Sequence, residues 1–268
     1  MVHSFAKAAA YADHLAAAEQ TLAGAAPLTE LDRELTVEQA YLVQLETIGR
    51  RVAGGAKIVG KKIGLTSLAM QKLLGVDQPD YGHLLDDMAV ENNGDIPAGR
   101  LLQPKVEAEI AFVLKKDLAG PNVTAADVLL ATQYVLPALE IVDSRIADWK
   151  IKLQDTVADN ASSGLFVLGG KPVRVDEVDL PRLGMALYKN GSLVNTGVGA
   201  AALGNPAYCA AWLANKLHEF GITLKAGEVI LSGALSAAVN AEPGDTFSAR
   251  IACLGQVGVS FRCSGDGI

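Results

Sequence analysis

The sequence predicts an α+β fold, organised around a mixed sheet or roll. Helical patterns fill the first sixty residues, and short apolar segments typical of strands follow from Gln103 onward. A further observation, Asn190-Gly191 between two such segments, is a strong signal for an antiparallel hairpin. No internal repeat, low-complexity linker or long charge run divides the 268 residues. We therefore expect one domain over 1–268, with a helical portion over 1–60 and a β-roll over 61–268.

Helices are predicted where apolar patterns begin and end at residues that favour helix termini. Thr36 and Gln39 form a capping box, because each side chain can bond to the other residue's backbone N–H. Glycines at 24, 75 and 221 stand where helices are expected to end. The predicted helices are 5–22, 36–54, 67–74 and 206–220.

Strands are predicted where short runs of apolar residues are bounded by turn-forming residues. Two of these runs flank the Asn190-Gly191 turn and form the predicted hairpin. The loop 75–82 and the polar loop 159–164 are expected to be irregular, because they are rich in Gly, Pro, Asp, Asn and Ser. The predicted strands are 57–65, 106–114, 134–142, 165–168, 185–188, 193–198, 228–232, 246–251 and 257–261.

The charge and composition exclude several classes of partner. The chain has 30 acidic and 23 basic residues, a net charge of −7, and no basic stripe that would bind a nucleic-acid backbone. The longest uncharged run, 190–215, is interrupted by Gly and Pro and does not predict a membrane span. No signal peptide is predicted. The three cysteines lack metal-ligand spacing and indicate reduced thiols in a cytoplasmic protein: Cys209, Cys253 and Cys263.

Two carboxylates share one face of the strand predicted over 106–114. Glu107 and Glu109 alternate with apolar residues, so their side chains point the same way and lie about 7 Å apart. Two like charges on an otherwise apolar strand are unfavourable unless a cation lies between them. The alternative is an exposed strand face with two solvated glutamates, because this spacing is common.

A third carboxylate, Glu140, favours the metal interpretation. It ends an apolar run and is followed by Ile141-Val142, so we expect it to be buried, and a buried carboxylate needs a partner. Arg145 is the competing partner, which would make Glu140 part of a structural ion pair. Three oxygen ligands suit Mg²⁺ or Mn²⁺, and the four histidines show no zinc-ligand spacing.

A lysine between two glycines is the candidate proton-transfer group. In the strand predicted over 57–65, Lys62 shares a face with Ile58, Gly60 and Gly64, and the two glycines leave room beside it for a ligand or for another backbone. An ordinary surface lysine is the alternative interpretation, and on local grounds Lys61 could also be the relevant lysine. Asp77 or Asp80 could pair with the lysine, although either could be only a turn residue.

Taken together, three stretches strongly resemble the 2-hydroxypenta-2,4-dienoate (vinylpyruvate) hydratases of aromatic meta-cleavage catabolism. These enzymes belong to the hydratase/decarboxylase branch of the fumarylacetoacetate-hydrolase superfamily. The resemblance extends from about residue 36 to the C-terminus. The stretches that carry it are KKIGLTSLAMQKLLGVDQPDYG (61–82), QPKVEAEIAFVL (103–114) and PALEIVDSRIADWKIKLQDTVADNASSGLFVLG (137–169).

The resemblance implies a fumarylacetoacetate-hydrolase-like rolled mixed sheet and assigns roles to individual residues. It implies Lys62 and Asp80 as the catalytic pair, and a serine near the substrate carboxylate at Ser162, with Ser163 as the adjacent alternative. Leu65 is implied as a further substrate-binding residue. The implied ligands of Mg²⁺ or Mn²⁺ are Glu107, Glu109 and Glu140.

The resemblance also implies partners. We expect a small 2-oxo or 2-hydroxydienoate substrate, a homo-oligomer of five or ten subunits, and a possible complex with 4-oxalocrotonate decarboxylase. The decarboxylase activity itself is the main alternative, because those enzymes resemble the hydratases throughout and would use the same metal. A non-catalytic scaffold subunit is an alternative of another class.

Overall fold

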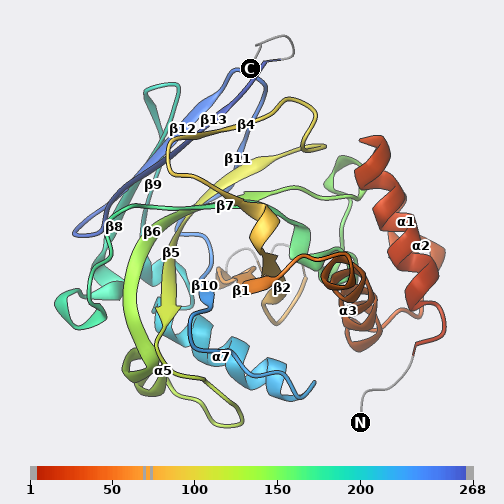
Figure 1. Ribbon diagram of the computed structural model, residues 1–268, viewed down its shortest axis with the longest axis horizontal. Helices are drawn as coiled ribbons and strands as arrows, with labels where there is room; N and C mark the ends of the chain where they lie inside the picture. The colour runs from red at the N-terminus through yellow and green to blue at the C-terminus, as the bar shows by residue number, and fades with distance from the viewer. Residues whose placement is uncertain (1–4, 69–70, 73–74, 264–268) are drawn as a thin grey trace.

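The computed structural model describes residues 5–68, 71–72 and 75–263. The chain forms two mixed sheets with helices at the N-terminal side and beneath the larger sheet (Figure 1). This arrangement confirms the predicted α+β class. Its helices are α1 (Ala8–Thr21), α2 (Leu28–Leu31), α3 (Val37–Ala53), α5 (Ala125–Ala131), α6 (Leu153–Ala158) and α7 (Pro206–His218).

The larger sheet runs in the order β2-β1-β10-β5-β6-β7-β3, with β11 also paired to β5. Most neighbours are antiparallel, whereas β1 with β10 and β3 with β7 are parallel. Its strands are β1 (Ile58–Gly64), β2 (Asp80–Leu85), β3 (Ala89–Val90), β5 (Lys105–Leu114), β6 (Thr132–Val142), β7 (Ser163–Leu168), β10 (Val229–Leu231) and β11 (Val239–Asn240).

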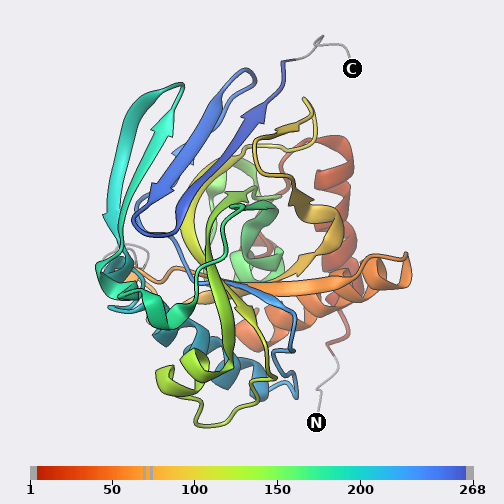
Figure 2. The ribbon, with the colours of Figure 1, turned by 60° about the vertical axis from the view of Figure 1, so that its left-hand side comes forward.

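The smaller sheet, in the order β4-β13-β12-β8-β9, lies on the opposite side of the molecule from α1 and α3 (Figure 2). The predicted hairpin is confirmed: Asn190 and Gly191 adopt φ of 52° and 78° between β8 and β9, as a tight hairpin turn requires. The strands of this sheet are β4 (Gly94–Ile96), β8 (Gly184–Lys189), β9 (Ser192–Val198), β12 (Thr246–Ile251) and β13 (Gly255–Phe261).

The N-terminal helices pack on the edge of the larger sheet through a buried polar contact. The predicted capping box is present at the start of α3, where Thr36 accepts from the backbone of Gln39. Further along α3, Gln44 is fully buried and its Nε2 donates to the carbonyls of Tyr81 in β2 and Val157 in α6. The beginning of the chain is therefore tied to the strands that carry the candidate site.

Several elements differ from the prediction. Residues 80–82, predicted as the end of the irregular loop 75–82, instead begin the fully buried strand β2, because pairing with β1 satisfies a backbone whose local sequence favours a turn. Helices α5 and α6 were not predicted. Helix α1 ends at Thr21 because Leu22, before the expected Gly24, adopts the left-handed conformation. Of the predicted helix 67–74, residues 69–70 and 73–74 lie outside the described residues.

None of the helices in the described part of the chain is both long and apolar enough to cross a membrane.

Candidate functional site

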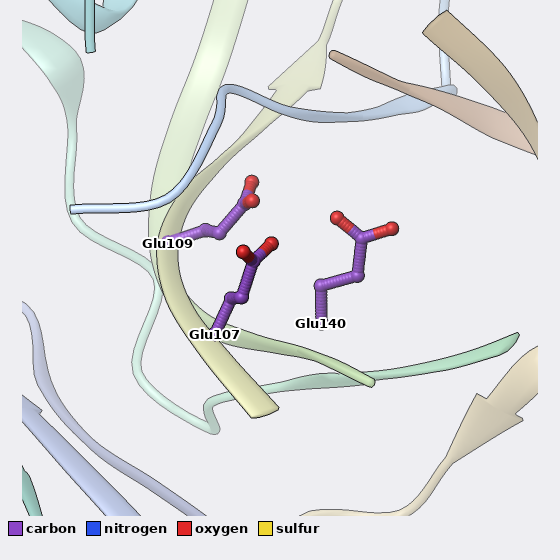
Figure 3. A group of neighbouring side chains, drawn as sticks. All are labelled: Glu107, Glu109 and Glu140. Atoms are coloured by element: carbon purple, nitrogen blue, oxygen red, sulfur yellow. The ribbon is translucent and has the colours of Figure 1, made fainter. Parts of the chain in front are cut away.

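The paired strands β5 and β6 bring three carboxylates together. Glu107 lies directly opposite Glu140 in the antiparallel register, and Glu109 follows two residues later on the same face of β5. One carboxylate oxygen from each residue lies within 4.8 Å of the others. Figure 3 shows the three side chains pointing into the same space. The fold therefore brings the three glutamates together, as the sequence predicts.

The carboxylate cluster (Glu107, Glu109 and Glu140) is buried more deeply than a solvated strand face would be. Glu109 and Glu140 are fully buried and Glu107 is half-buried. Burial raises the pKa of all three carboxyl groups, that of Glu107 to about 7, and the neighbouring charge of Glu140 raises the pKa values of Glu107 and Glu109 further. The interpretation of Glu107 and Glu109 as a solvated pair is wrong.

The donor set fits a hard divalent cation. Glu109 accepts a hydrogen bond from the Gly233 N–H at 2.8 Å, and Oε1 of Glu140 accepts one from the Ser163 hydroxyl at 3.3 Å and faces a lysine ammonium at 3.2 Å. The other oxygens, Oε1 of Glu109 and Oε2 of Glu140, are buried and have no hydrogen-bond partner among the described residues. Buried carboxylate oxygens without donors are stabilised by a positive charge or by protonation, and a set of three that converge in one space suits an oxygen-preferring cation such as Mg²⁺, Mn²⁺ or Ca²⁺.

The lysine beside the cluster is Lys62 of β1. Its Nζ lies 3.2 Å from Oε1 of Glu140 and donates to the Ala161 carbonyl at 2.8 Å. Burial acts to lower the pKa of Lys62, but the surrounding carboxylates, Glu140 first, outweigh it and the pKa lies above its ordinary value. Lys61 points to the other face of the strand and pairs with Glu228 at 3.0 Å. The geometry therefore separates the two lysine candidates.

Arg145 is not the partner of Glu140. The Arg145 guanidinium is buried and forms an ion pair with Asp159, while the cation next to Glu140 is Lys62. The competing interpretation of Glu140 as half of an Arg145 ion pair is wrong, because the turn that follows β6 directs Arg145 toward the 159–163 segment.

Asp80 is the acid that faces Lys62. It begins β2 and lies opposite Gly64 of β1. A Cβ at Gly64 would lie 2.2 Å from Oδ1 of Asp80 and 3.1 Å from Nζ of Lys62, so the glycine leaves the space that both groups border. Asp80 is buried, whereas Asp77 is exposed. Its Oδ2 accepts from the Thr156 hydroxyl at 2.8 Å and its Oδ1 has no partner within the described residues.

The two serines of the 159–164 segment have different surroundings. Ser162 is buried, and its hydroxyl has no partner in the described part of the chain, whereas Ser163 donates to Glu140. Leu65 is half-buried, at φ 55°, and lines a small cavity of about 40 Å³ together with Asp80 and Thr156. These positions place Ser162 and Leu65 beside the lysine and its acid.

Three groups that hydrogen-bond to the site residues were not predicted from the sequence. They are the Gly233 N–H, which donates to Glu109, the Thr156 hydroxyl, which donates to Asp80, and the Ala161 carbonyl, which accepts from Lys62. Only Gly233 had a recognisable signal, since a glycine directly after an apolar strand often marks a close approach of backbone.

The rolled mixed sheet and its buried acidic cluster define the class of protein. The family model for the fumarylacetoacetate (FAA) hydrolase C-terminal domain matches residues 77–262, which include all three glutamates. The chain belongs to the fumarylacetoacetate hydrolase family.

Within the family, the chain is similar to dienoate hydratases. It is 57% identical over 197 residues to 2-hydroxypent-2,4-dienoate hydratase of Pseudomonas putida, covering 73% of this chain and 89% of that protein. It is 51% identical over 238 residues to 2-hydroxyhexa-2,4-dienoate hydratase of Comamonas testosteroni, covering 88% and 90%. The structure of 4-oxalocrotonate decarboxylase from Pseudomonas putida G7, complexed with magnesium and adipate, matches with a TM-score of 0.93 and 42% identity, covering 95% of this chain and 97% of that one.

Proposed function

We propose that this chain is a hydro-lyase that adds water to 2-hydroxypenta-2,4-dienoate and forms 4-hydroxy-2-oxopentanoate in aromatic meta-cleavage catabolism. The observation that carries the proposal is the buried cluster of three glutamates with Lys62 in contact with one of them. The two hydratase relatives share 57% and 51% of their aligned residues with this chain, against 42% for the decarboxylase, and this difference favours hydration.

Glu107, Glu109 and Glu140 would hold Mg²⁺ or Mn²⁺. When bound, that ion supplies Lewis-acid stabilisation of negative charge on the C2 oxygen of the substrate. Asp80 and Lys62 border the same space over Gly64, and we assign them the proton transfers. The Ser162 hydroxyl, unpartnered among the described residues, would hold the substrate carboxylate, and Leu65 lines the neighbouring cavity.

The proton balance requires two carbon protonations and one water. The proton lost from the C2 hydroxyl is matched by protonation at C5, which leaves a conjugated 2-oxo-3-enoate with an electrophilic C4. Water then adds its hydroxyl to C4 and its remaining proton to C3. We assign Lys62 as the group that delivers and recovers the proton; the negative charges of Asp80 and Glu140 favour its protonated form and therefore its reprotonation after each transfer.

Decarboxylation of 4-oxalocrotonate is the second candidate. The TM-score of 0.93 to the decarboxylase favours it as the alternative, because the same site could stabilise the enolate that forms when CO₂ leaves. The scaffold alternative is disfavoured, because every proposed metal-ligand and proton-transfer position is occupied by a side chain that can perform that role. We further propose that residues 1–268 act as one hydratase domain in a cytoplasmic pentamer or decamer, able to associate with a decarboxylase.

A paired turnover assay with Mg²⁺ tests the proposal. One sample receives 2-hydroxypenta-2,4-dienoate and the other 4-oxalocrotonate, with ultraviolet loss of the dienol and mass detection of products. Metal-dependent formation of 4-hydroxy-2-oxopentanoate without CO₂ release is the expected result. CO₂ release from the second substrate would replace the proposal by decarboxylation, and no turnover of either substrate would refute both.

Variants of the two adjacent lysines sharpen this test. Lys62→Met is expected to lower kcat at least about 100-fold, because a positioned proton-transfer group contributes roughly that factor. Lys61→Met removes the same charge from the opposite face of β1, where the partner is Glu228, and should retain turnover once folding is verified. Equal losses in the two variants would contradict the assignment of Lys62.

A further inference from the structure

A strained turn lies next to the candidate lysine. Asn160, Ala161 and Ser162 are three successive non-glycine residues with φ of 53°, 52° and 53°. The left-handed conformation costs L-residues roughly 1–2 kcal/mol each, so three in a row persist only when the surrounding structure holds them. We call residues 160–162 the left-handed turn.

One side of the left-handed turn is held by strand β2. The Asn160 side chain accepts a hydrogen bond from the His83 N–H at 2.7 Å and donates to the His83 carbonyl at 2.9 Å, as a neighbouring strand would. The turn also presses against Gly82, where an added Cβ would lie 2.4 Å from the Asn160 carbonyl oxygen. These hydrogen bonds and the close approach to Gly82 therefore fix the position of the turn relative to β2.

The other side is held by Arg145. Its guanidinium donates to the carbonyl of Ser163, after the turn, at 2.9 Å and to the carbonyl of Asp159, before the turn, at 2.6 Å. Its Nε donates to the Asp159 carboxylate. A planar fork with several fixed donors can hold both ends of the turn at once, which a lysine ammonium at the same place cannot.

The turn transmits this fixed geometry to the candidate lysine. Between the two ends held by Arg145, the Ala161 carbonyl accepts the hydrogen bond from Lys62 at 2.8 Å. Among the described residues, the other close contact of the ammonium is with Oε1 of Glu140, at 3.2 Å. The Lys62 ammonium lies between the carboxylate cluster and the left-handed turn, and the Ala161 carbonyl therefore fixes its position.

We propose that Arg145 is a positioning residue for Lys62, acting through the left-handed turn and together with the Asn160 side chain. This inference rests on the proposed function, in which Lys62 transfers protons. Arg145 does not touch the site itself. Its loss should change the placement of the ammonium and hence the rate of proton transfer, and leave substrate binding nearly unchanged, because misplacing a reacting group by about 1 Å can cost 100-fold in rate.

Arg145→Lys is the principal test, because it keeps the positive charge beside Asp159 and loses the fork. We expect kcat for 2-hydroxypenta-2,4-dienoate to fall about 10- to 100-fold with KM nearly unchanged. Arg50→Lys is the matched control: Arg50 also makes three hydrogen bonds, but only to residues of α1 and α3, and kcat should stay at the wild-type value. Asn160→Asp, which keeps the acceptor for His83 and loses the donor, should reproduce the kcat loss.

A double-mutant cycle separates positioning from a purely structural role. In a Lys62→Met background, Arg145→Lys should lower the residual turnover no further, because the group it positions is absent. A wild-type kcat in Arg145→Lys, or an equal loss in both backgrounds, would overturn the inference while leaving the proposed function intact. Undiminished turnover in Lys62→Met alone would instead refute the proposed role of the lysine.

Discussion

Replacing His83 by asparagine should remove a specific pH dependence of stability. The His83 imidazole is buried, and its Nδ1 lies 2.9 Å from Oε1 of Gln44. Because Nε2 of Gln44 already donates to two carbonyls, its Oε1 faces the ring, and Nδ1 must carry the proton of a neutral imidazole. Burial, with a smaller effect from the Lys61 charge, lowers the pKa of His83 to about 3.

The magnitude follows from the two pKa values of His83. In the unfolded chain the imidazole titrates near 6.5, so between that pH and about 3 the unfolded state binds more protons and stability falls as the pH falls. At about 1.4 kcal/mol per pH unit, the loss between pH 6.5 and pH 5 is about 2 kcal/mol. Above pH 6.5 this contribution is constant.

Urea unfolding of the wild type and His83→Asn at pH 5, 6, 7 and 8 measures the effect. The asparagine amide can replace Nδ1 as donor to Gln44 but does not titrate. We expect the difference between the two unfolding free energies to be constant at pH 7 and 8 and to shift against the wild type by about 2 kcal/mol at pH 5. A difference that does not vary with pH would refute the assignment of a neutral buried imidazole.

Three further outcomes are expected. We expect Mg²⁺ to raise the unfolding temperature of the wild type and Glu109→Gln to abolish that rise. The variant should not destabilise the metal-free protein, because it removes one of three carboxylates that lie close together; calorimetry with and without metal measures both. Gly82→Ala should cost about 1–3 kcal/mol in urea because of its 2.4 Å backbone contact, whereas Gly184→Ala, with open space, should change stability by less than about 0.5 kcal/mol. Thr29→Val should cost about 1–3 kcal/mol by the same measurement, since the Thr29 hydroxyl donates to the buried Asp155 carboxylate at 2.7 Å; an unchanged midpoint would show that water replaces the donor.

The sequence was sufficient where a local period determines the outcome. The alternation around Glu107 and Glu109 predicts a shared face because successive side chains of a strand point to opposite sides, and the structure confirms that convergence. The α3 capping box and the β8–β9 turn are likewise local, and both are present.

The sequence was insufficient where a contact depends on topology. Whether Lys62 or Arg145 would be the cation beside Glu140 could not be read locally, because β1 reaches β5 only through β10, which lies far along the chain. The first half of strand β2 was interpreted as loop because DQPDYG (77–82) has the composition of a turn, and only its pairing with β1 makes it part of a strand. The left-handed turn was hidden because Ala161 and Ser162 rarely adopt that conformation.

Because Glu107 lies directly opposite Glu140, the site depends on the register between β5 and β6, which can change only by whole residues. A strand cannot shift by a fraction of a position, and a one-residue slip turns every side chain to the other face. The register shift between β5 and β6 lies at Val113/Leu114, beyond the glutamates. Insertions in the connection 115–131 can thus accumulate during evolution without moving the site, whereas deletion of a single codon between 105 and 107 would rotate glutamates out of the cluster at once.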